Sequence, residues 1–208
     1  MLDIKQRLQE IRGLTLFNPM DKSALKVQSI NSHSYLDINN ETYKVTGVSR
    51  YLDVKWNNFK KRNNDYWVTE LQLVHLVSGK STFIEWEYDD ELEIGETLAE
   101  VKLRDIQFDG KPLTRAALEY IADEEMGSVT CQGKTYHYVE DDTWAALYYR
   151  SNDATPLPVR MYEFASDDDQ FLTVEAWEED DDKPSREAFI SRSVKETSVV
   201  VLQLGQKH

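Results

Sequence analysis

The sequence has few of the residues that usually carry chemistry. Its 208 residues include one cysteine and four histidines, and its eight glycines never cluster. The single cysteine, Cys131, excludes an intrachain disulfide and any site built from several thiolates. The histidines form neither an H-x-H nor an H-E-x-x-H grouping, so they do not indicate zinc: His33, His75, His137 and His208. Without a glycine-rich loop or a G-x-S-x-G motif, the sequence predicts neither phosphate binding nor that class of hydrolase.

Basic residues are scarce as well. The chain has 38 Asp and Glu against 24 Lys and Arg, which gives a formal net charge of −14. A nucleic-acid-binding protein needs a basic face that displaces counterions from phosphates. The densest basic run is only "KKR" at 60–62. The composition therefore argues against direct binding to DNA or RNA.

Long apolar runs are absent too. No segment approaches the roughly 20 apolar residues of a membrane-spanning helix. The N-terminal "MLDIKQRLQEIRG" lacks the apolar core and cleavage site of a signal peptide. We therefore expect a soluble, cytoplasmic protein, whose association with a membrane would go through a partner. The sequence leaves the oligomeric state open.

What the chain does contain is a strand pattern rich in aromatic residues. Alternating apolar and polar residues over 66–77 and 81–88, joined by "SGK", predict a two-stranded hairpin. Residues 1–12 predict a helix whose apolar face (Ile4, Leu8, Ile11) docks on its own domain, with a partner or a membrane as alternatives. A second helix is expected over 115–126, with Thr114 as N-cap and Gly127 after its end.

Two stretches resemble each other, "FIEWEYDD" at 83–90 and "LTVEAWEEDD" at 172–181. Together with Tyr43 and Tyr136 they suggest an internal duplication of about 90 residues. Ala176 is then an extra residue, which needs a β-bulge to keep Trp177 on the face that Trp86 occupies. We expect a mainly β protein with two related antiparallel meanders or half-barrels in tandem. The predicted segments are an N-terminal helix and connection (1–32), a first β unit (33–110), and a linking helix with a second β unit (111–208).

The same residues resemble a bacterial family catalogued as domain of unknown function 4178. Its pattern is a G-x-x-Y strand, a tyrosine-bearing strand that ends in an acidic turn, and an L-x-x-E-x-W strand. Here these are Gly133 with Tyr136, Tyr162 before the acidic turn, and Leu172, Glu175 and Trp177. The resemblance spans roughly residues 35–195 and departs where "REAF" replaces the usual glycine. It implies an accessory or interaction role linked to membrane or envelope stress, with no catalytic residues to carry over.

The acid-rich segments are the weak candidates for a cation site of the calcium type, and they comprise Asp167, Asp168, Asp169, Asp180, Asp181 and Asp182. They lack the spacing that wraps one ion, and exposed acidic turns are stable without an ion because water and salt screen their repulsion. His137 with Glu140 and Asp141 is a conceivable acid–base group, but alternation along a strand separates His137 from Asp141 by about 13 Å. We therefore assign no catalytic, cofactor-binding or firm metal residues.

Three functions are compatible with the sequence. The preferred one is a non-catalytic interaction module whose acidic surface binds a basic protein partner. The alternative is a binder of a small ligand or a calcium-type cation, which would use an aromatic seam or the acidic turns. An enzyme with an unrecognised site is the third, and it would need carboxylates with perturbed pKa values in a cleft.

Overall fold

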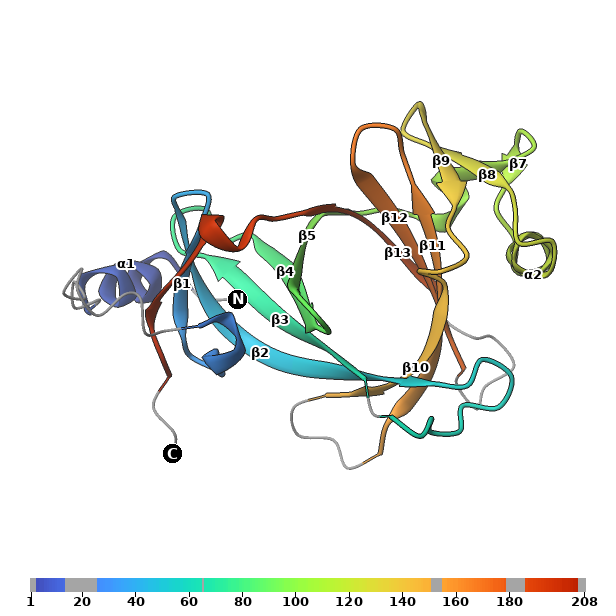
Figure 1. The fold of residues 1–208 in the computed structure, drawn as a ribbon. Coiled ribbons are helices and arrows are strands. Elements are labelled where there is room, and N and C mark those ends of the chain that lie inside the picture. Colours follow the sequence, from blue (N-terminus) through green and yellow to red (C-terminus); the bar gives the residue numbers. More distant parts are fainter. Residues whose placement is uncertain (1–2, 14–25, 65, 151–154, 179–185, 206–208) are drawn as a thin grey trace. The chain divides into compact units, whose positions relative to one another are not determined.

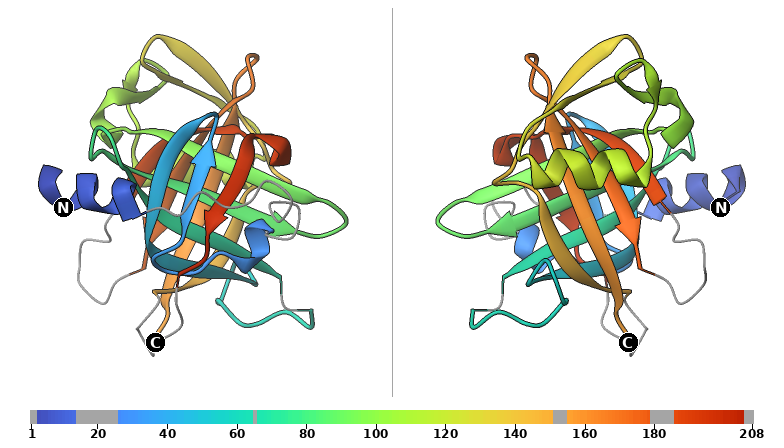
Figure 2. Two further views of the ribbon diagram at one scale, coloured as in Figure 1. Left: turned by 90° about the vertical axis from the view of Figure 1, so that its left-hand side faces the viewer. Right: turned by 90° about the vertical axis from the view of Figure 1, so that its right-hand side faces the viewer.

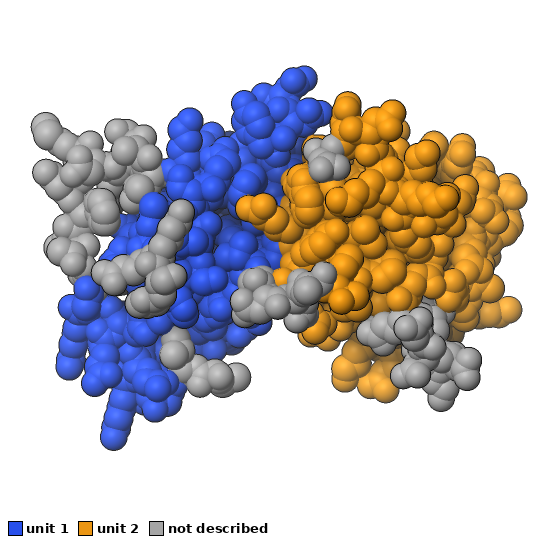
Figure 3. Space-filling model, turned by 90° about the horizontal axis from the view of Figure 1, so that it is seen from below, with its two compact units in different colours: residues 1–49, 69–96, 194–208 blue, residues 50–68, 97–193 orange. Residues whose placement is uncertain are grey.

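The computed structural model describes residues 3–13, 26–64, 66–150, 155–178 and 186–205. The chain forms two compact units, each assembled from segments far apart in the sequence (Figure 3). Unit 1 comprises residues 1–49, 69–96 and 194–208, and unit 2 comprises residues 50–68 and 97–193. The last strand therefore belongs to the same unit as the first ones.

Strands make up most of the described chain, as the alternating pattern predicted. Unit 1 contains all or most of β1 (Tyr35–Ile38), β2 (Glu41–Val54), β3 (Trp67–His75), β4 (Ser81–Tyr88), β5 (Leu92–Glu100) and β14 (Val199–Gln203). Unit 2 contains the ends of β2 and β5 with β6 (Ile106–Phe108), β7 (Lys111–Pro112), β8 (Ser128–Cys131), β9 (Lys134–Tyr138), β10 (Trp144–Tyr149), β11 (Leu157–Ala165), β12 (Gln170–Trp177) and β13 (Arg186–Ser193). The predicted hairpin over 66–88 is confirmed by the pairing of β3 with β4.

Hydrogen bonding joins the strands in the order β14-β1-β2-β3-β4-β5-β13-β12-β11-β9-β8-β6-β7 (Figure 1, Figure 2). Strand β10 lies off this path and pairs with both β11 and β2. Within unit 2, β10 therefore links β11 to the C-terminal part of β2. The predicted mainly β class with an N-terminal helix is confirmed.

The second helix, α2, spans Arg115–Asp123. Its predicted N-cap is confirmed, because the backbone N–H of Ala117 donates to Thr114 Oγ1 at 3.2 Å. The expected C-terminal glycine is wrong: the helix ends before Gly127, and Glu125 adopts the left-handed conformation with φ of 55°. Among the described residues, short 3₁₀ turns lie at Val27–Ser29, Leu103–Asp105 and Glu196–Ser198. Within the described ranges, no helix is both long and apolar enough to span a bilayer.

The first helix, α1, spans Ile4–Gly13, as the N-terminal pattern predicted. Its apolar side chains do not dock on unit 1, and that expectation is wrong, since all three are exposed: Ile4, Leu8 and Ile11. Polar contacts hold the helix instead. Glu10 pairs with Lys44 of β2 at 2.5 Å, and Arg7 Nη1 donates to the carbonyl of Val77 at 2.8 Å.

Each unit has its own hydrophobic core. The core of unit 1 gathers fully buried side chains from five strands: Leu36, Ile38, Val45, Leu71, Leu73, Ile84 and Val201. The largest core of unit 2 packs α2 against the neighbouring strands: Ile106, Leu118, Ile121, Val129, Tyr136, Phe164, Leu172 and Val174. Burial of such side chains is worth roughly 1.5–3 kcal/mol each, so these clusters are what hold α2 and the strands in place.

The two tryptophan strands orient their indoles differently. In β4, Ile84 and Trp86 both pack on the core of unit 1. In β12, Val174 belongs to the largest core of unit 2, whereas Trp177 packs in a separate cluster with Tyr51. The register between β12 and β13 runs one to one up to Ala176, so the strand alternation carries Trp177 to the opposite face. The internal duplication stays a prediction.

Glu85 on β4 should make the stability of the protein depend on pH. It lies opposite Glu70 of β3, and burial, followed by the charges of Glu70 and Glu87, raises its pKa from 4.5 to about 8. Between these values the folded state retains a proton that the unfolded chain releases, so stability falls as pH rises. In urea denaturation at pH 5 and pH 8 (the ends of this window, about 4.5 to 8), Glu85→Gln is expected to lose less stability than the wild type. An equal loss in both proteins would contradict the assignment.

Candidate functional site

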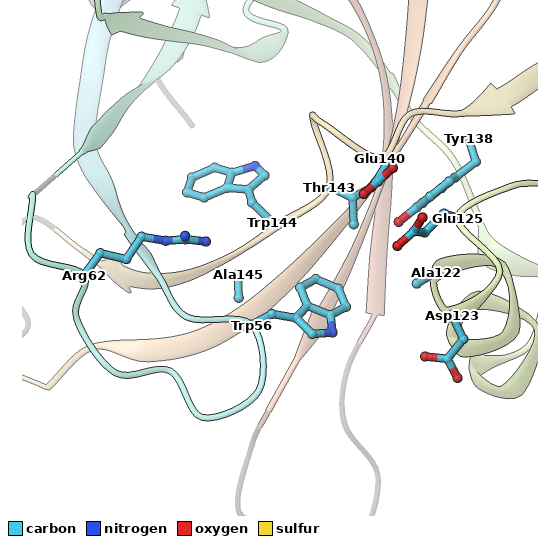
Figure 4. A pocket seen from close by; sticks show the side chains of 10 residues that line it. All are labelled: Trp56, Arg62, Ala122, Asp123, Glu125, Tyr138, Glu140, Thr143, Trp144 and Ala145. Atoms are coloured by element: carbon cyan, nitrogen blue, oxygen red, sulfur yellow. The ribbon is translucent and has the colours of Figure 1, made fainter.

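Unit 2 contains a pocket of about 220 Å³ at the C-terminal end of α2. Three segments line it: the loop after β2, the end of α2 with the residues after it, and the connection from β9 to β10 (Figure 4). In that order they contribute Trp56 and Arg62; Ala122, Asp123 and Glu125; and Tyr138, Glu140, Thr143, Trp144 and Ala145. The carboxylates of Glu125 and Glu140 lie near the phenol of Tyr138, and the indole of Trp56 forms a wall, whereas the indole of Trp144 points away and packs against Tyr51 (Figure 4).

Arg160 on β11 holds the loop that carries Trp56. Its guanidinium carbon lies 5.4 Å from the ring centroid of Trp56 and 4.7 Å from that of Phe59. Its Nη2 donates to the carbonyl of Trp56 at 3.4 Å, and its Nη1 pairs with the carboxylate of Glu178. Trp56 also packs edge-on against Tyr162, with 5.4 Å between the ring centroids. These contacts fix the indole at the pocket wall.

The end of α2 brings Asp123 and Glu125 to the pocket. The backbone N–H of Glu125 donates to the carbonyl of Ala122 at 3.3 Å, and that of Met126 donates to the carbonyl of Ile121 at 3.2 Å. This is the Schellman arrangement, which places a left-handed residue after the helix, usually glycine. Here that residue is Glu125 with φ of 55°, a conformation that costs a non-glycine residue on the order of 1 kcal/mol.

The connection from β9 to β10 is a tight turn that positions Glu140. The backbone N–H of Thr143 donates to the carbonyl of Glu140 at 3.0 Å, and Thr143 Oγ1 donates to the carbonyl of Val139 at 2.9 Å. The same hydroxyl accepts from the backbone N–H of Glu163 on β11 at 3.1 Å. The turn is therefore fixed to the sheet rather than held by its own residues alone.

The charge at the pocket is negative. Among the described residues that line the pocket, Arg62 is the one cation, and Asp123, Glu125 and Glu140 are acidic. Arg62 is already engaged, because its Nε lies 2.7 Å from Oδ2 of Asp53. The last turn of α2 carries no basic residue, so its own carbonyl groups add to the negative potential at this end.

The pKa of Tyr138 is affected by the same negative charges. Burial raises the pKa of its phenol most, a hydrogen bond to Thr143 opposes that effect, and the carboxylates of Glu140 and Glu125 raise the pKa further. The phenol therefore stays neutral at physiological pH and offers the pocket an aromatic face and a hydroxyl. A cation placed here meets carboxylates and aromatic rings together.

Of the aspartates proposed as weak cation ligands, the described ones do not line the pocket. Asp167–Asp169 form the turn between β11 and β12, and Asp180–Asp182 lie outside the described residues. Asp168 accepts hydrogen bonds from Lys134 Nζ at 2.6 Å and from Ser166 Oγ at 2.7 Å, and these contacts lower its pKa. In the part of the chain that the structure describes, no group of three or more His, Cys, Asp or Glu side chains is arranged to hold a metal ion.

The other sequence candidates also have local structural surroundings. Cys131 is buried in the core of unit 2, and burial raises the pKa of its thiol, which is the environment of an unreactive cysteine. His137 Nδ1 lies 2.8 Å from Oγ of Ser128 on the neighbouring strand β8. Of the acid–base group considered with His137, Glu140 lines the pocket.

A protein-family model described as a domain of unknown function, DUF4178, matches residues 33–196. The chain belongs to the DUF4178 family. No curated protein and no solved structure matches it. Most of the residues that carried the resemblance lie in unit 2, where Gly133 with φ of 79° turns the chain from β8 into β9. Tyr136 is buried behind that turn, and its hydroxyl donates to Gln170 Oε1 at 3.4 Å.

The L-x-x-E-x-W strand of the DUF4178 pattern is β12. Leu172 packs on the largest core of unit 2, while Glu175 and Trp177 lie on the other face. Glu175 is buried and accepts a hydrogen bond from the hydroxyl of Tyr51 at 3.4 Å. Trp177 packs edge-on against Tyr148, with 5.2 Å between the ring centroids. These family residues therefore hold β12 in place, next to the strands that build the pocket.

Sequence reasoning missed the pocket acids at the end of α2 and gave Glu140 a different role. Their signal is the pair of short acidic runs "DEE" at 123–125 and "EDD" at 140–142, one just after a helix and one just after a strand. Each run alone is typical of a solvated turn. Only the pairing of β9 with both β8 and β11 brings the two runs to one pocket.

Removing the Arg160 guanidinium should destabilise unit 2 and release Trp56. In Arg160→Met the Glu178 carboxylate loses its closest cation and the two rings lose their cation–π contact, at a cost of about 2 kcal/mol. Arg115→Met is the matched control, since the more exposed Arg115 lies 3.4 Å from Glu178 and should cost about 0.5 kcal/mol. Urea denaturation followed by tryptophan fluorescence measures both, and equal losses would contradict the role given to Arg160.

Replacing Glu125 by glycine should stabilise the protein. Glycine relieves the left-handed strain and removes a negative charge from the C-terminal end of α2, for a gain of about 0.5–1 kcal/mol. Glu125→Gln removes only the charge and should gain less than half of that. Thermal or urea unfolding measures the difference, and a destabilised Glu125→Gly would mean that the carboxylate makes a contact that stabilises the fold.

Proposed function

We propose that the protein is a non-catalytic binding module that holds a basic side chain of a protein partner in the pocket of unit 2. The observation that carries this proposal is a pocket lined by acidic and aromatic residues, in which the carboxylates of Glu125 and Glu140 gather at the phenol of Tyr138 and the indole of Trp56 forms a wall (Figure 4). Lysine and arginine side chains combine a positive head with an apolar stem, and this lining suits both parts.

Charge supports a cationic ligand in particular. A cation in the pocket gains from the carboxylates of Glu125 and Glu140 and from the C-terminal end of α2, which has no basic residue in its own last turn. Cation–π attraction to the Trp56 indole and the Tyr138 phenol adds about 0.5–2 kcal/mol. The net charge of −14 then speeds the approach of a basic partner over longer distances.

The strain at Glu125 supports a binding role as well. A glycine at this position would satisfy the helix end at lower cost, yet the chain places a carboxylate there. Strained residues of this kind gather at functional sites, where their side chain serves a purpose other than stability. In this proposal that purpose is the recognition of a cation.

The size of the pocket favours one side chain over a cofactor-sized molecule. Ligand pockets for drug-sized molecules measure about 300–1,000 Å³, whereas this one measures about 220 Å³. A protein partner would supply further contacts around the inserted side chain. The accessory role in envelope stress that the family resemblance implies stays a prediction.

Titration with a short peptide that carries one arginine between glycines and serines tests the proposal. The double variant Glu125→Gln/Glu140→Gln should weaken binding about tenfold, which equals about 1.4 kcal/mol. Asp89→Asn/Asp90→Asn removes two charges from an exposed turn of unit 1 and should change the affinity less than about twofold. Raising the salt from about 0.05 M to about 0.5 M should weaken binding to the wild type.

Three results would contradict the proposal: no binding by the wild type, equal weakening in both double variants, or binding that is unchanged by salt. Equal weakening would show a general attraction to an acidic protein without a site. A parallel thermal-shift experiment with calcium at matched ionic strength separates the cation alternative. A calcium-specific shift that Glu125→Gln/Glu140→Gln leaves intact would move the function to the acidic turns.

A further inference from the structure

The exposed face of α1 is a second feature that the unit 2 pocket does not explain. Ile4, Leu8 and Ile11 are 63%, 47% and 38% exposed, and they follow the i, i+4, i+7 spacing of one helix face. No residue of the helix is buried. Exposed apolar side chains that are contiguous on one face, rather than scattered, are typical of an interaction site.

Contacts on the other side of α1 fix the helix with this face outward. Glu10 pairs with Lys44 at 2.5 Å, and Arg7 Nη1 donates to the carbonyls of Val77 at 2.8 Å and Leu76 at 3.5 Å. A helix of ten residues is only marginally stable alone in water, so these contacts stabilise it and set its orientation. The apolar face of α1 is therefore held facing the solvent and is not a loosely packed part of the core.

The charged residues beside the apolar face of α1 indicate which kind of partner surface would bind it. Lys5 and Arg12 are exposed and lie two helical turns apart along the same edge of the apolar face. The two acidic residues are used elsewhere: Asp3 Oδ1 accepts from the backbone N–H groups of Lys5 and Gln6, and Glu10 holds Lys44. In a chain with a net charge of −14, this one edge is basic.

From this geometry we infer that α1 docks as a helix into an apolar groove of a partner protein, and that the rim of the groove carries carboxylates. Amphipathic helices bind grooves through anchors at i, i+4 and i+7, which is the spacing of Ile4, Leu8 and Ile11. Lys5 and Arg12 then pair with the acidic rim and set the direction of the helix. This site takes an acidic partner surface, whereas the unit 2 pocket takes a basic side chain.

Two other occupants fit the face less well. A second copy of α1 would bring Lys5 and Arg12 of both helices toward each other, and like charges across such a seam disfavour pairing. Binding of a helix to a membrane surface scales with the apolar area that it buries, and α1 offers only a narrow stripe of three aliphatic side chains. Charge and shape together favour the protein groove.

Calcium-loaded calmodulin is the probe for this chemistry, since its acidic, methionine-rich apolar groove accepts amphipathic helices and closes without calcium. The full chain should bind it with calcium and lose binding with chelator. Ile4→Gln/Ile11→Gln and Lys5→Gln/Arg12→Gln should each weaken binding about tenfold or more. Lys60→Gln/Lys61→Gln removes two exposed positive charges of unit 2 and should change it less than about twofold.

The pocket variant Glu125→Gln/Glu140→Gln leaves α1 unchanged and should bind calmodulin like the wild type. The experiment can therefore contradict this inference without contradicting the proposed function, and the reverse. Because the substituted α1 residues are exposed, circular dichroism should show unchanged folding. Absence of calcium-dependent binding, or equal binding by all variants, would overturn the inference. Sedimentation velocity and anionic vesicles test the other occupants, and a dimer or lipid binding that depends on Ile4 and Ile11 would reassign the face.

Discussion

The pocket of unit 2 depends on the contact between Arg160 and Glu178. That ion pair anchors a guanidinium between the rings of Trp56 and Phe59, and the same guanidinium donates to the carbonyl of Trp56. Backbone hydrogen bonds within the loop after β2, such as that from Lys55 N–H to the carbonyl of Lys60 at 2.9 Å, shape the loop itself, and Arg160 ties it to β11. Arg160 therefore positions the aromatic wall of the pocket. The carboxylates of Glu125 and Glu140 then remain for the cation of a ligand.

Much of the fold could be predicted because it follows from local patterns. Period-two alternation predicts β3 and β4, and Thr114 marks the start of α2. The errors have physical causes. Gly127 is the more usual helix-ending residue, but the chain uses the strained Glu125 two positions earlier. The face of α1 was expected to be buried, but periodicity shows only that a face is apolar and does not show what covers it.

The site was harder to predict than the fold. Glu125 and Glu140 lie on separate acidic runs, and each run alone has the composition of a solvated turn. They meet because β9 pairs with β8 on one side and with β11 on the other, and such long-range pairing leaves no mark in either run. The aspartate runs at Asp167–Asp169 and Asp180–Asp182 were the ones considered as cation ligands, because consecutive aspartates supply oxygen ligands. In the first of them, Asp168 is engaged by Lys134.

The most direct test of the account is to observe the indole of Trp56 while a cation binds. The five tryptophan side chains give separate indole N–H signals in a nitrogen-15 spectrum, which can be assigned by substitution. Titration with the single-arginine peptide should shift the signal of Trp56, whose indole forms a wall of the pocket, and leave that of Trp86 in unit 1 unchanged. Shifts spread equally over all five signals, or no shift at Trp56, would contradict the assignment of this pocket as the binding site.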